Sequence, residues 1–115
     1  MTQRGAGRRR VTAWPVIAGC SLFWAAPLAA DYQSTMEALT RGLPSEAAGL
    51  IYRIVDCNHW GGEEPYDDAR KTDIEAAMSR LRCNDLERDV AIARQRYATS
   101  PEVLDAIDKA KTLAF

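Results

Sequence analysis

The sequence is poor in the residues that most catalytic and metal sites use. Its 115 residues include one histidine and three cysteines, and no two cysteines form a Cys-x-x-Cys pair. Nucleophilic acyl transfer needs a Ser, Thr or Cys beside a base that a third group orients. Structural zinc sites need sets of Cys and His ligands. The sequence therefore predicts neither an enzyme nor a zinc domain, and it indicates no cofactor.

Acidic residues are absent from the first thirty positions. Four arginines between residues 4 and 10 form a basic head, and residues 11–28 are almost wholly apolar and uncharged. The small residues Ala29 and Ala30 precede a polar remainder that opens with Asp31. This order is typical of a secretory signal peptide. We therefore expect residues 1–30 to be removed and residues 31–115 to be exported to the periplasm or the medium.

An alternative processing site lies within the apolar segment. The stretch Ile17-Ala18-Gly19-Cys20 is similar to a bacterial lipobox, in which Cys20 would be lipidated and become the new N-terminus. However, residues 21–30 are still apolar, whereas a lipid-anchored protein normally begins with a polar tether. Cleavage before Asp31 is the favoured prediction. Lipidation at Cys20 and an uncleaved membrane anchor are the alternatives.

The predicted mature chain is acidic. Residues 31–115 carry 11 Lys and Arg against 16 Asp and Glu, a net charge of −5. Nucleic-acid binding requires a basic surface, so this charge argues against a nucleic-acid partner. It favours solubility and a basic protein partner. The remaining 85 residues make one small domain, which gains from a covalent link.

Two cysteines, Cys57 and Cys83, remain after residue 30. An even pair in an oxidising compartment indicates a disulfide. The alternatives are a metal pair, which is weak because the chain has no Cys-x-x-Cys, and a reactive thiol, which is weak because an oxidising compartment would oxidise free thiols. We predict a Cys57–Cys83 disulfide that stabilises the domain by about 3.5 kcal/mol.

Hydrophobic spacing predicts an all-α domain of four to five short helices. The first runs from Tyr32 to a Gly42-Leu43-Pro44 stop, and the second begins at a Ser45 cap and ends at Cys57. Three further helices are expected, with caps at Asp67 or Asp68, at Asn84 or Asp85, and at Ser100 before Pro101.

The predicted disulfide constrains the segment between the second and third helices. Both cysteines are expected at the C-terminal ends of successive helices, and the third helix is about 24 Å long. Bonded cysteines need Cα atoms roughly 4.4–6.8 Å apart. We therefore expect residues 58–66 to run back, stretched out, along the third helix.

Residues 57–67 hold the single histidine, the single tryptophan after residue 30, a glycine pair and several carboxylates. Three interpretations compete. In the structural interpretation, Trp60 fills the side of the core and His59 bonds a carboxylate. Composition favours this interpretation, since tryptophan in a small domain is usually buried.

A metal site is the second interpretation, with the potential ligands His59, Glu63, Glu64, Asp67 and Asp68. Its single histidine and its spacing match neither a zinc site nor an EF-hand.

The third interpretation is a recognition loop. Aromatic anchors among polar groups are typical of binding hot spots, and the candidate binding residues are His59, Trp60, Glu63, Glu64 and Tyr66. On this basis we expect a small exported, non-enzymatic binding or accessory protein. An inhibitor, an immunity factor or an envelope-complex subunit would fit, with a protein partner in the cell envelope and no membrane span after processing.

A second charged region lies in the C-terminal half. Its basic residues are Arg80, Arg82, Arg88, Arg94 and Arg96. Because Asp85, Glu87 and Asp89 are interleaved with them, we expect a solvated surface of mutually paired charges rather than an anion site.

Overall fold

Five α-helices and one 3₁₀-helix follow one another along the chain. The computed structural model describes residues 12–13, 15, 19, 28–113 and 115, and these contain no strand. The helices are α1 (Leu28–Thr40), α2 (Ser45–Gly61), α3 (Asp68–Arg80), η1 (Cys83–Asp85), α4 (Leu86–Arg96) and α5 (Pro101–Thr112). The prediction of an all-α domain with four to five short helices is confirmed over the described residues.

The helix boundaries follow from local chemistry. Gly42 turns the chain after α1 with a φ of +76°, a conformation that glycine adopts without steric cost. The Asp67 carboxylate accepts a hydrogen bond of 2.7 Å from the Arg70 amide and caps α3, as predicted. Pro101 occupies the first position of α5, where its missing N–H costs nothing. Ser45 is the first residue of α2 rather than its cap, which is Pro44.

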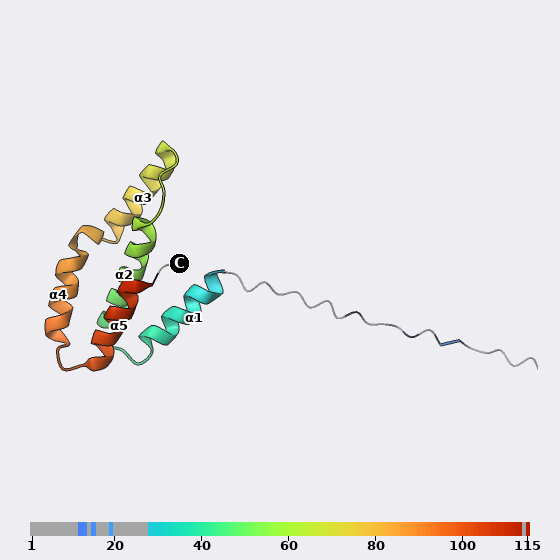
Figure 1. Cartoon of the computed structure of the whole chain (residues 1–115), viewed down its shortest axis with the longest axis horizontal. Coiled ribbons are helices and arrows are strands. Elements are labelled where there is room, and N and C mark those ends of the chain that lie inside the picture. The colour runs from blue at the N-terminus through green and yellow to red at the C-terminus, as the bar shows by residue number, and fades with distance from the viewer. Residues whose placement is uncertain (1–11, 14, 16–18, 20–27, 114) are drawn as a thin grey trace, which may run out of the picture.

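Helix α2 lies at the centre of the domain and contacts every other α-helix, most extensively α5 (Figure 1). The largest fully buried side chains come from three helices and pack around this contact. They are Met36, Ile51, Ile54, Val55 and Ile107. Each fully buried aliphatic side chain contributes about 1.5–3 kcal/mol of transfer free energy. This α2–α5 core is the body on which the remaining elements are placed.

Helix α1 is held on α2 by one buried and one polar contact. Met36 is fully buried, and the Tyr32 hydroxyl donates a hydrogen bond of 2.7 Å to Asp56. Burial, together with this bond to a carboxylate, raises the pKa of Tyr32 above its ordinary value of 10.0. The hydroxyl therefore stays protonated and remains a donor.

Helix α3 projects from the body and forms a hairpin with α2 (Figure 1). Ala77 is its single buried residue. The other members of the predicted apolar stripe, Ile74, Met78 and Leu81, are only partly covered. Hydrophobic burial alone therefore attaches this helix weakly.

A disulfide fastens the C-terminal end of α3 to α2. Cys57 and Cys83 are bonded with a Cα–Cα distance of 5.7 Å, which confirms the predicted pair. Cys57 is buried. The link closes a loop across 26 positions that contains the last turn of α2, residues 62–67 and α3.

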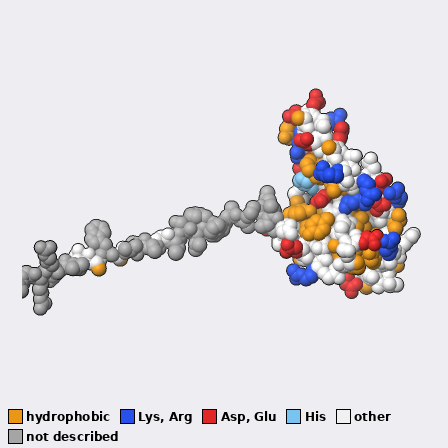
Figure 2. All heavy atoms as spheres, turned by 180° about the vertical axis from the view of Figure 1, so that it is seen from behind, with side chains coloured by type: hydrophobic (Ala, Val, Ile, Leu, Met, Phe, Trp, Pro, Cys, Tyr) orange, Lys and Arg blue, Asp and Glu red, His pale blue; other side chains and the backbone are white. Residues whose placement is uncertain are grey.

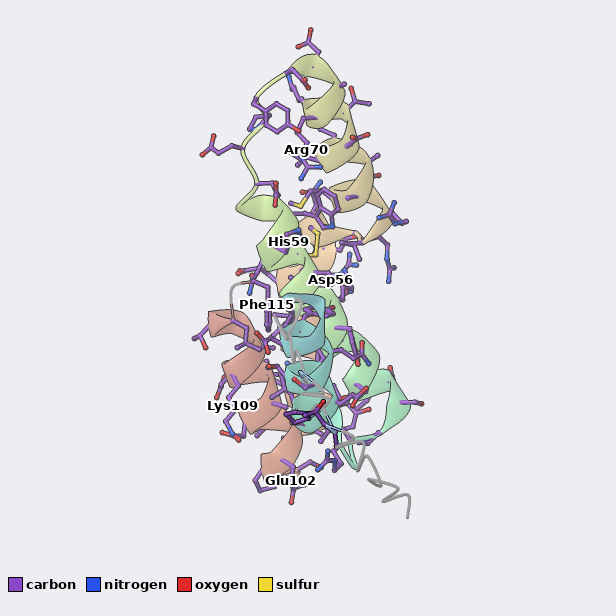
Figure 3. The ribbon with its side chains drawn as sticks, turned by 90° about the vertical axis from the view of Figure 1, so that its right-hand side faces the viewer. Asp56, His59, Arg70, Glu102, Lys109 and Phe115 are labelled. Carbon is purple, nitrogen blue, oxygen red and sulfur yellow. A yellow bond between two sulfur atoms is a disulfide. The ribbon has the colours of Figure 1, made fainter. Side chains whose placement is uncertain are left out.

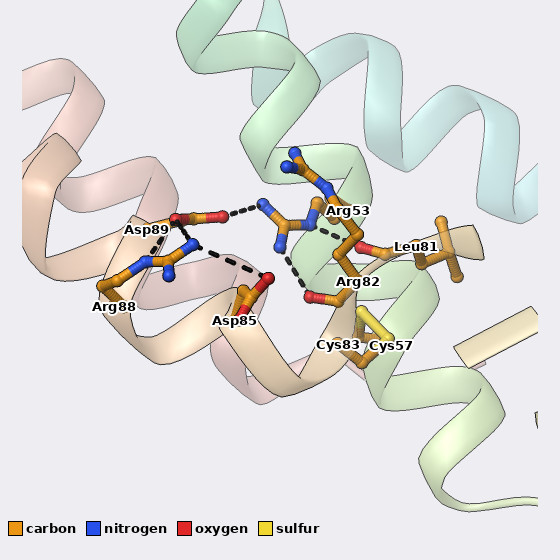
Figure 4. A network of polar contacts seen from close by, with 8 residues as sticks. All are labelled: Arg53, Cys57, Leu81, Arg82, Cys83, Asp85, Arg88 and Asp89. Carbon is orange, nitrogen blue, oxygen red and sulfur yellow. Dashed lines mark hydrogen bonds and ion pairs between the residues drawn. A yellow bond between two sulfur atoms is a disulfide. The ribbon is translucent and has the colours of Figure 1, made fainter. Parts of the chain in front are cut away.

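Arg53 reinforces the same junction (Figure 4). Its guanidinium donates hydrogen bonds to the main-chain oxygens of Leu81 and Arg82 and to the Asp89 carboxylate, and each bond is 2.6 Å long. The side chain is only 14% exposed, and its charge-assisted bonds to Leu81 and Asp89 are partly buried. The ion pairs with Arg53 and Arg88 hold the pKa of Asp89 below its ordinary value. Arg53 thus joins α2 to the end of α3 and to the start of α4.

The end of α2 differs from its prediction. The helix does not stop at Cys57 but continues for one more turn to Gly61, and Gly62 N–H closes it on the Asn58 and His59 carbonyls. The expected stretched segment is therefore shorter and spans residues 62–67. The extra helical turn is about 6 Å long, and the six residues of the linker can span at most about 20 Å. Together they are long enough to run the length of α3, which is roughly 20 Å.

The processing predictions fall mostly outside the described residues. Cys20 and most of the predicted signal peptide are not among them, while the three residues before Asp31 form the first turn of α1. None of the described helices is both long and apolar enough to cross a membrane.

Replacing both cysteines by alanine should lower the free energy of unfolding by about 3.5 kcal/mol, because the unfolded chain regains the entropy of a closed loop. Urea unfolding followed by circular dichroism measures this change. The conservative core variant Ile107→Val, which should cost only about 0.5–1.5 kcal/mol, is the control. A double cysteine variant as stable as the parent would contradict the assigned role of the disulfide.

Candidate functional site

The last turn of α2 contacts the C-terminal end of α5. Asn58 Nδ2 donates to the main-chain oxygens of Ala110, Lys111 and Leu113, at 3.1, 3.3 and 3.4 Å. These oxygens belong to the C-terminal end of α5, where carbonyls lack helical partners. Asn58 therefore acts as a side-chain cap for α5.

His59 lies between the hairpin and the body (Figure 3). Its Nδ1 is 3.1 Å from the main-chain oxygen of Phe115, and its Nε2 is 3.5 Å from Glu63 Oε1. Both neighbours of the imidazole are acceptor oxygens. The histidine thus connects the end of α2 to the C-terminal segment and to the first residues of the linker.

Trp60 is covered by Arg70 from the facing helix. The guanidinium carbon of Arg70 lies 5.3 Å from the centre of the indole ring, within the range of a cation–π contact. The His59 ring meets the indole edge-on at 5.4 Å. Glu63 completes the group, because its carboxylate accepts a hydrogen bond of 2.6 Å from Arg70. We call His59, Trp60, Glu63 and Arg70 the latch.

The latch is tied together electrostatically. The hydrogen bond from Arg70 lowers the pKa of Glu63 below its ordinary value of 4.5, and the same bond raises the pKa of Arg70. Both shifts favour the charged forms. Arg70 Nε is buried without a hydrogen-bond partner in the described part of the chain, where the guanidinium lies against the indole. The latch therefore closes the base of the linker onto the first turn of α3.

The linker turns outward immediately after the latch. Tyr66 N–H donates to the Glu64 carbonyl over 3.0 Å, which makes a tight turn around Pro65. Tyr66 is 78% exposed, the largest exposure among the large hydrophobic side chains described. Glu64 and Pro65 are exposed as well. We call Glu64, Pro65 and Tyr66 the tip.

The five predicted site residues thus separate into two groups. His59, Trp60 and Glu63 belong to the latch, where their side chains are partly buried and mutually engaged. Glu64 and Tyr66 belong to the tip and face solvent. The first group makes contacts within the hairpin, although Trp60 does not belong to the buried core and the His59 side chain is still 40% exposed. The second group lies in solvent.

A metal centre would need a third ligand near His59 and Glu63. Among the residues that the structure describes, no three His, Cys, Asp or Glu side chains are grouped so that they could hold a metal ion. Glu64 is exposed on the tip, and Asp67 is engaged as the cap of α3. The geometry gives the metal alternative no support.

Arg70 is the latch residue that sequence reasoning missed. It stands seven positions after Glu63, at the third residue of a helix, where nothing in the local pattern distinguishes it from a solvated arginine. The spacing becomes informative only when the linker is known to reverse the chain. The sequence does place a tryptophan at the end of one helix and an arginine at the start of the next. This order is the signal that could have predicted the contact between Trp60 and Arg70.

Comparison with known proteins adds no further assignment. No protein-family model, curated protein or solved structure matches this chain significantly.

The latch predicts a pH dependence with a defined sign. Because the pKa of Glu63 is lowered, the pair with Arg70 contributes fully above 4.5 and is lost as the pH falls through the lowered pKa. Acidification should therefore release Arg70 from Trp60, with a midpoint below 4.5. The indole N–H resonance of Trp60, followed by NMR during a pH titration, measures this.

The variant Glu63→Gln should abolish that transition, whereas Asp68→Asn, at an exposed neighbouring carboxylate, should leave it in place. A midpoint at or above 4.5, or an unchanged titration in Glu63→Gln, would show that Glu63 does not hold the latch.

Proposed function

We propose that this chain is a small exported, non-enzymatic binding or accessory protein that engages a partner through the tip of the α2–α3 hairpin. Inhibitors, immunity factors and envelope-complex subunits are proteins of this class. One observation carries the proposal: a tyrosine that is 78% exposed stands at the free end of a hairpin fastened at its base. Exposed aromatic side chains are frequent anchors of protein interfaces.

The way in which the tip is held supports this role. The disulfide and Arg53 fix the C-terminal end of α3, and the latch fixes its first turn. Because both helices that the short linker joins are held in this way, the linker has little freedom. A loop that is already ordered loses less entropy on binding and gains affinity as a result. The partly buried Trp60 supports the tip from beneath rather than contacting the partner.

The charge of the hairpin indicates the chemistry of the partner. Asp and Glu side chains gather toward the free end of the hairpin (Figure 2), where Glu64, Asp67 and Asp68 are all exposed. An acidic surface around an aromatic residue complements a basic surface that has an apolar pocket. The proposed partner is therefore a basic protein of the cell envelope.

A non-enzymatic role is supported by the engagement of His59. Its two ring nitrogens face Phe115 and Glu63, so the single histidine is already occupied as a structural contact. The proposed export rests on the basic and apolar composition of residues 1–30 and on the disulfide.

Pull-down from envelope extract tests the tip directly. The variant Tyr66→Ala should lose the partner while its melting temperature stays unchanged, because an exposed side chain contributes little to stability. Trp60→Ala should instead lower the melting temperature, since it removes the latch. A control, Gln95→Ala, removes an exposed side chain outside the hairpin and should keep the partner. If Tyr66→Ala recovered the same partner as the parent chain, the tip would have no such role.

Mass spectrometry of the protein recovered from cells tests the compartment. Export with cleavage after residue 30 predicts an N-terminus at Asp31 and no free thiol. A lipidated N-terminus at Cys20 would support the lipoprotein alternative instead. An intact N-terminal segment in the cytosolic fraction would contradict export.

A further inference from the structure

A groove between α2 and α4 lies on the body, away from the hairpin tip. It has a volume of about 450 Å³. The residues that matter here are Gly49, Leu50, Arg82, Ile92, Arg96 and Tyr97, and we call this surface the α2–α4 groove. Three features of it are not required by the contacts that stabilise the fold, and together they favour a bound ligand.

The first feature is the backbone at Arg82. This residue has a φ of +52°, the single positive value among the non-glycine residues described. It follows the last residues of α3, at the position where glycine is strongly preferred because the left-handed conformation strains other side chains. The turn itself would form equally well with glycine. Because the turn does not require arginine, the presence of arginine at this position indicates a role for its guanidinium group.

The second feature is the side chain of Arg82, which is exposed and lines the groove. Neighbouring charges are paired: Arg53 with Asp89, Arg88 with Asp85 and Asp89, and Arg96 with Glu46. Arg82 has no carboxylate partner among the described residues, and the close-up of the junction draws none for it (Figure 4). Arg80 likewise has no carboxylate partner among the described residues, so the expected mutual pairing of this region holds for Arg88, Arg94 and Arg96 and not for Arg80 and Arg82.

The third feature is an uncovered surface beside these charges. Gly49 lies inside α2, where a Cβ atom would meet nothing within 4 Å, so neither packing nor backbone geometry requires glycine. Glycine is a poor helix former, and its use here leaves the backbone open to close approach. Ile92 is 50% exposed at the same groove, and Leu50 and Tyr97 are only half-buried.

We propose that the α2–α4 groove binds a short acidic segment of a partner protein. A carboxylate of the segment would take two hydrogen bonds from the fork of the Arg82 guanidinium. An apolar side chain would cover Ile92 and Leu50, and the segment's backbone would pass over Gly49. Arg96, whose present partner Glu46 is exposed, offers a second cation near the other end of the groove.

The length and charge of the groove define the segment. It follows α2 from Glu46 to Arg53, about 10 Å, which is the length of three extended residues. Glu46 and Asp89 also line it, so a polyanion such as nucleic acid would meet repulsion as well as attraction. Single carboxylates flanking one apolar residue fit this arrangement better. This surface is distinct from the tip, and the proposal does not depend on the function proposed above.

NMR titration of the ¹⁵N-labelled chain with the peptide acetyl-Glu-Leu-Glu-amide tests the proposal. We expect saturable shifts at Gly49, Arg82 and Ile92, and no such shifts with acetyl-Lys-Leu-Lys-amide or with inorganic phosphate. The tip variant Tyr66→Ala should bind the acidic peptide as well as the parent chain does, which separates this surface from the tip.

Two variants distinguish loss of binding from loss of structure. Arg82→Gly removes the guanidinium and relieves the left-handed strain, and Gly49→Ala fills the open space above the helix. Both should weaken binding at least fivefold while the melting temperature stays equal or rises. Arg80→Ala, which removes the same charge outside the groove, should bind like the parent.

The absence of shifts at millimolar acidic peptide would overturn the proposal. Equal shifts with the lysine peptide or with phosphate would also overturn it, as would full affinity in Arg82→Gly.

Discussion

The fastening of α3 to α2 is the constraint on which the rest of the hairpin depends. Helix α3 buries a single alanine, so hydrophobic packing cannot hold it in place by itself. Three contacts replace that packing: the Cys57–Cys83 bond, the bonds from Arg53 to the end of α3, and the Glu63–Arg70 pair at its start. A covalent link tolerates solvent exposure better than an ion pair does. The hairpin can therefore project from the body and still be ordered.

This arrangement divides the aromatic and acidic segment into the latch, whose side chains contact one another, and the exposed tip. In the latch, the side chains of Trp60, His59 and Glu63 make contacts within the molecule. In the tip, Tyr66 is exposed to solvent. Sequence reasoning treated the segment as one candidate site. The structure shows that neighbours in sequence have different surroundings, because the chain turns at Pro65, after Glu63 and before Tyr66.

Features set by local chemistry were predictable, and those set by distant contacts were not. The helix start at Asp68 follows from the Asp67 cap, and the start at Pro101 follows from a proline at the first helical position. The disulfide follows from two cysteines after an apolar leader-like segment. The last turn of α2 was missed because Asn58 is helical for a tertiary reason, namely its bonds to the end of α5. The role of Arg53 was missed because its partners are main-chain oxygens 28 and 29 positions away. Such contacts leave no local pattern in the sequence.

Hydrogen exchange of the oxidised and reduced chain, resolved by residue, tests the central claim most directly. If the disulfide holds the hairpin on the body, reduction should speed exchange in α3 and the linker far more than in α2 and α5, whose core is independent of it. Unchanged protection of α3 after reduction would contradict the account, because packing alone would then be sufficient to hold the hairpin.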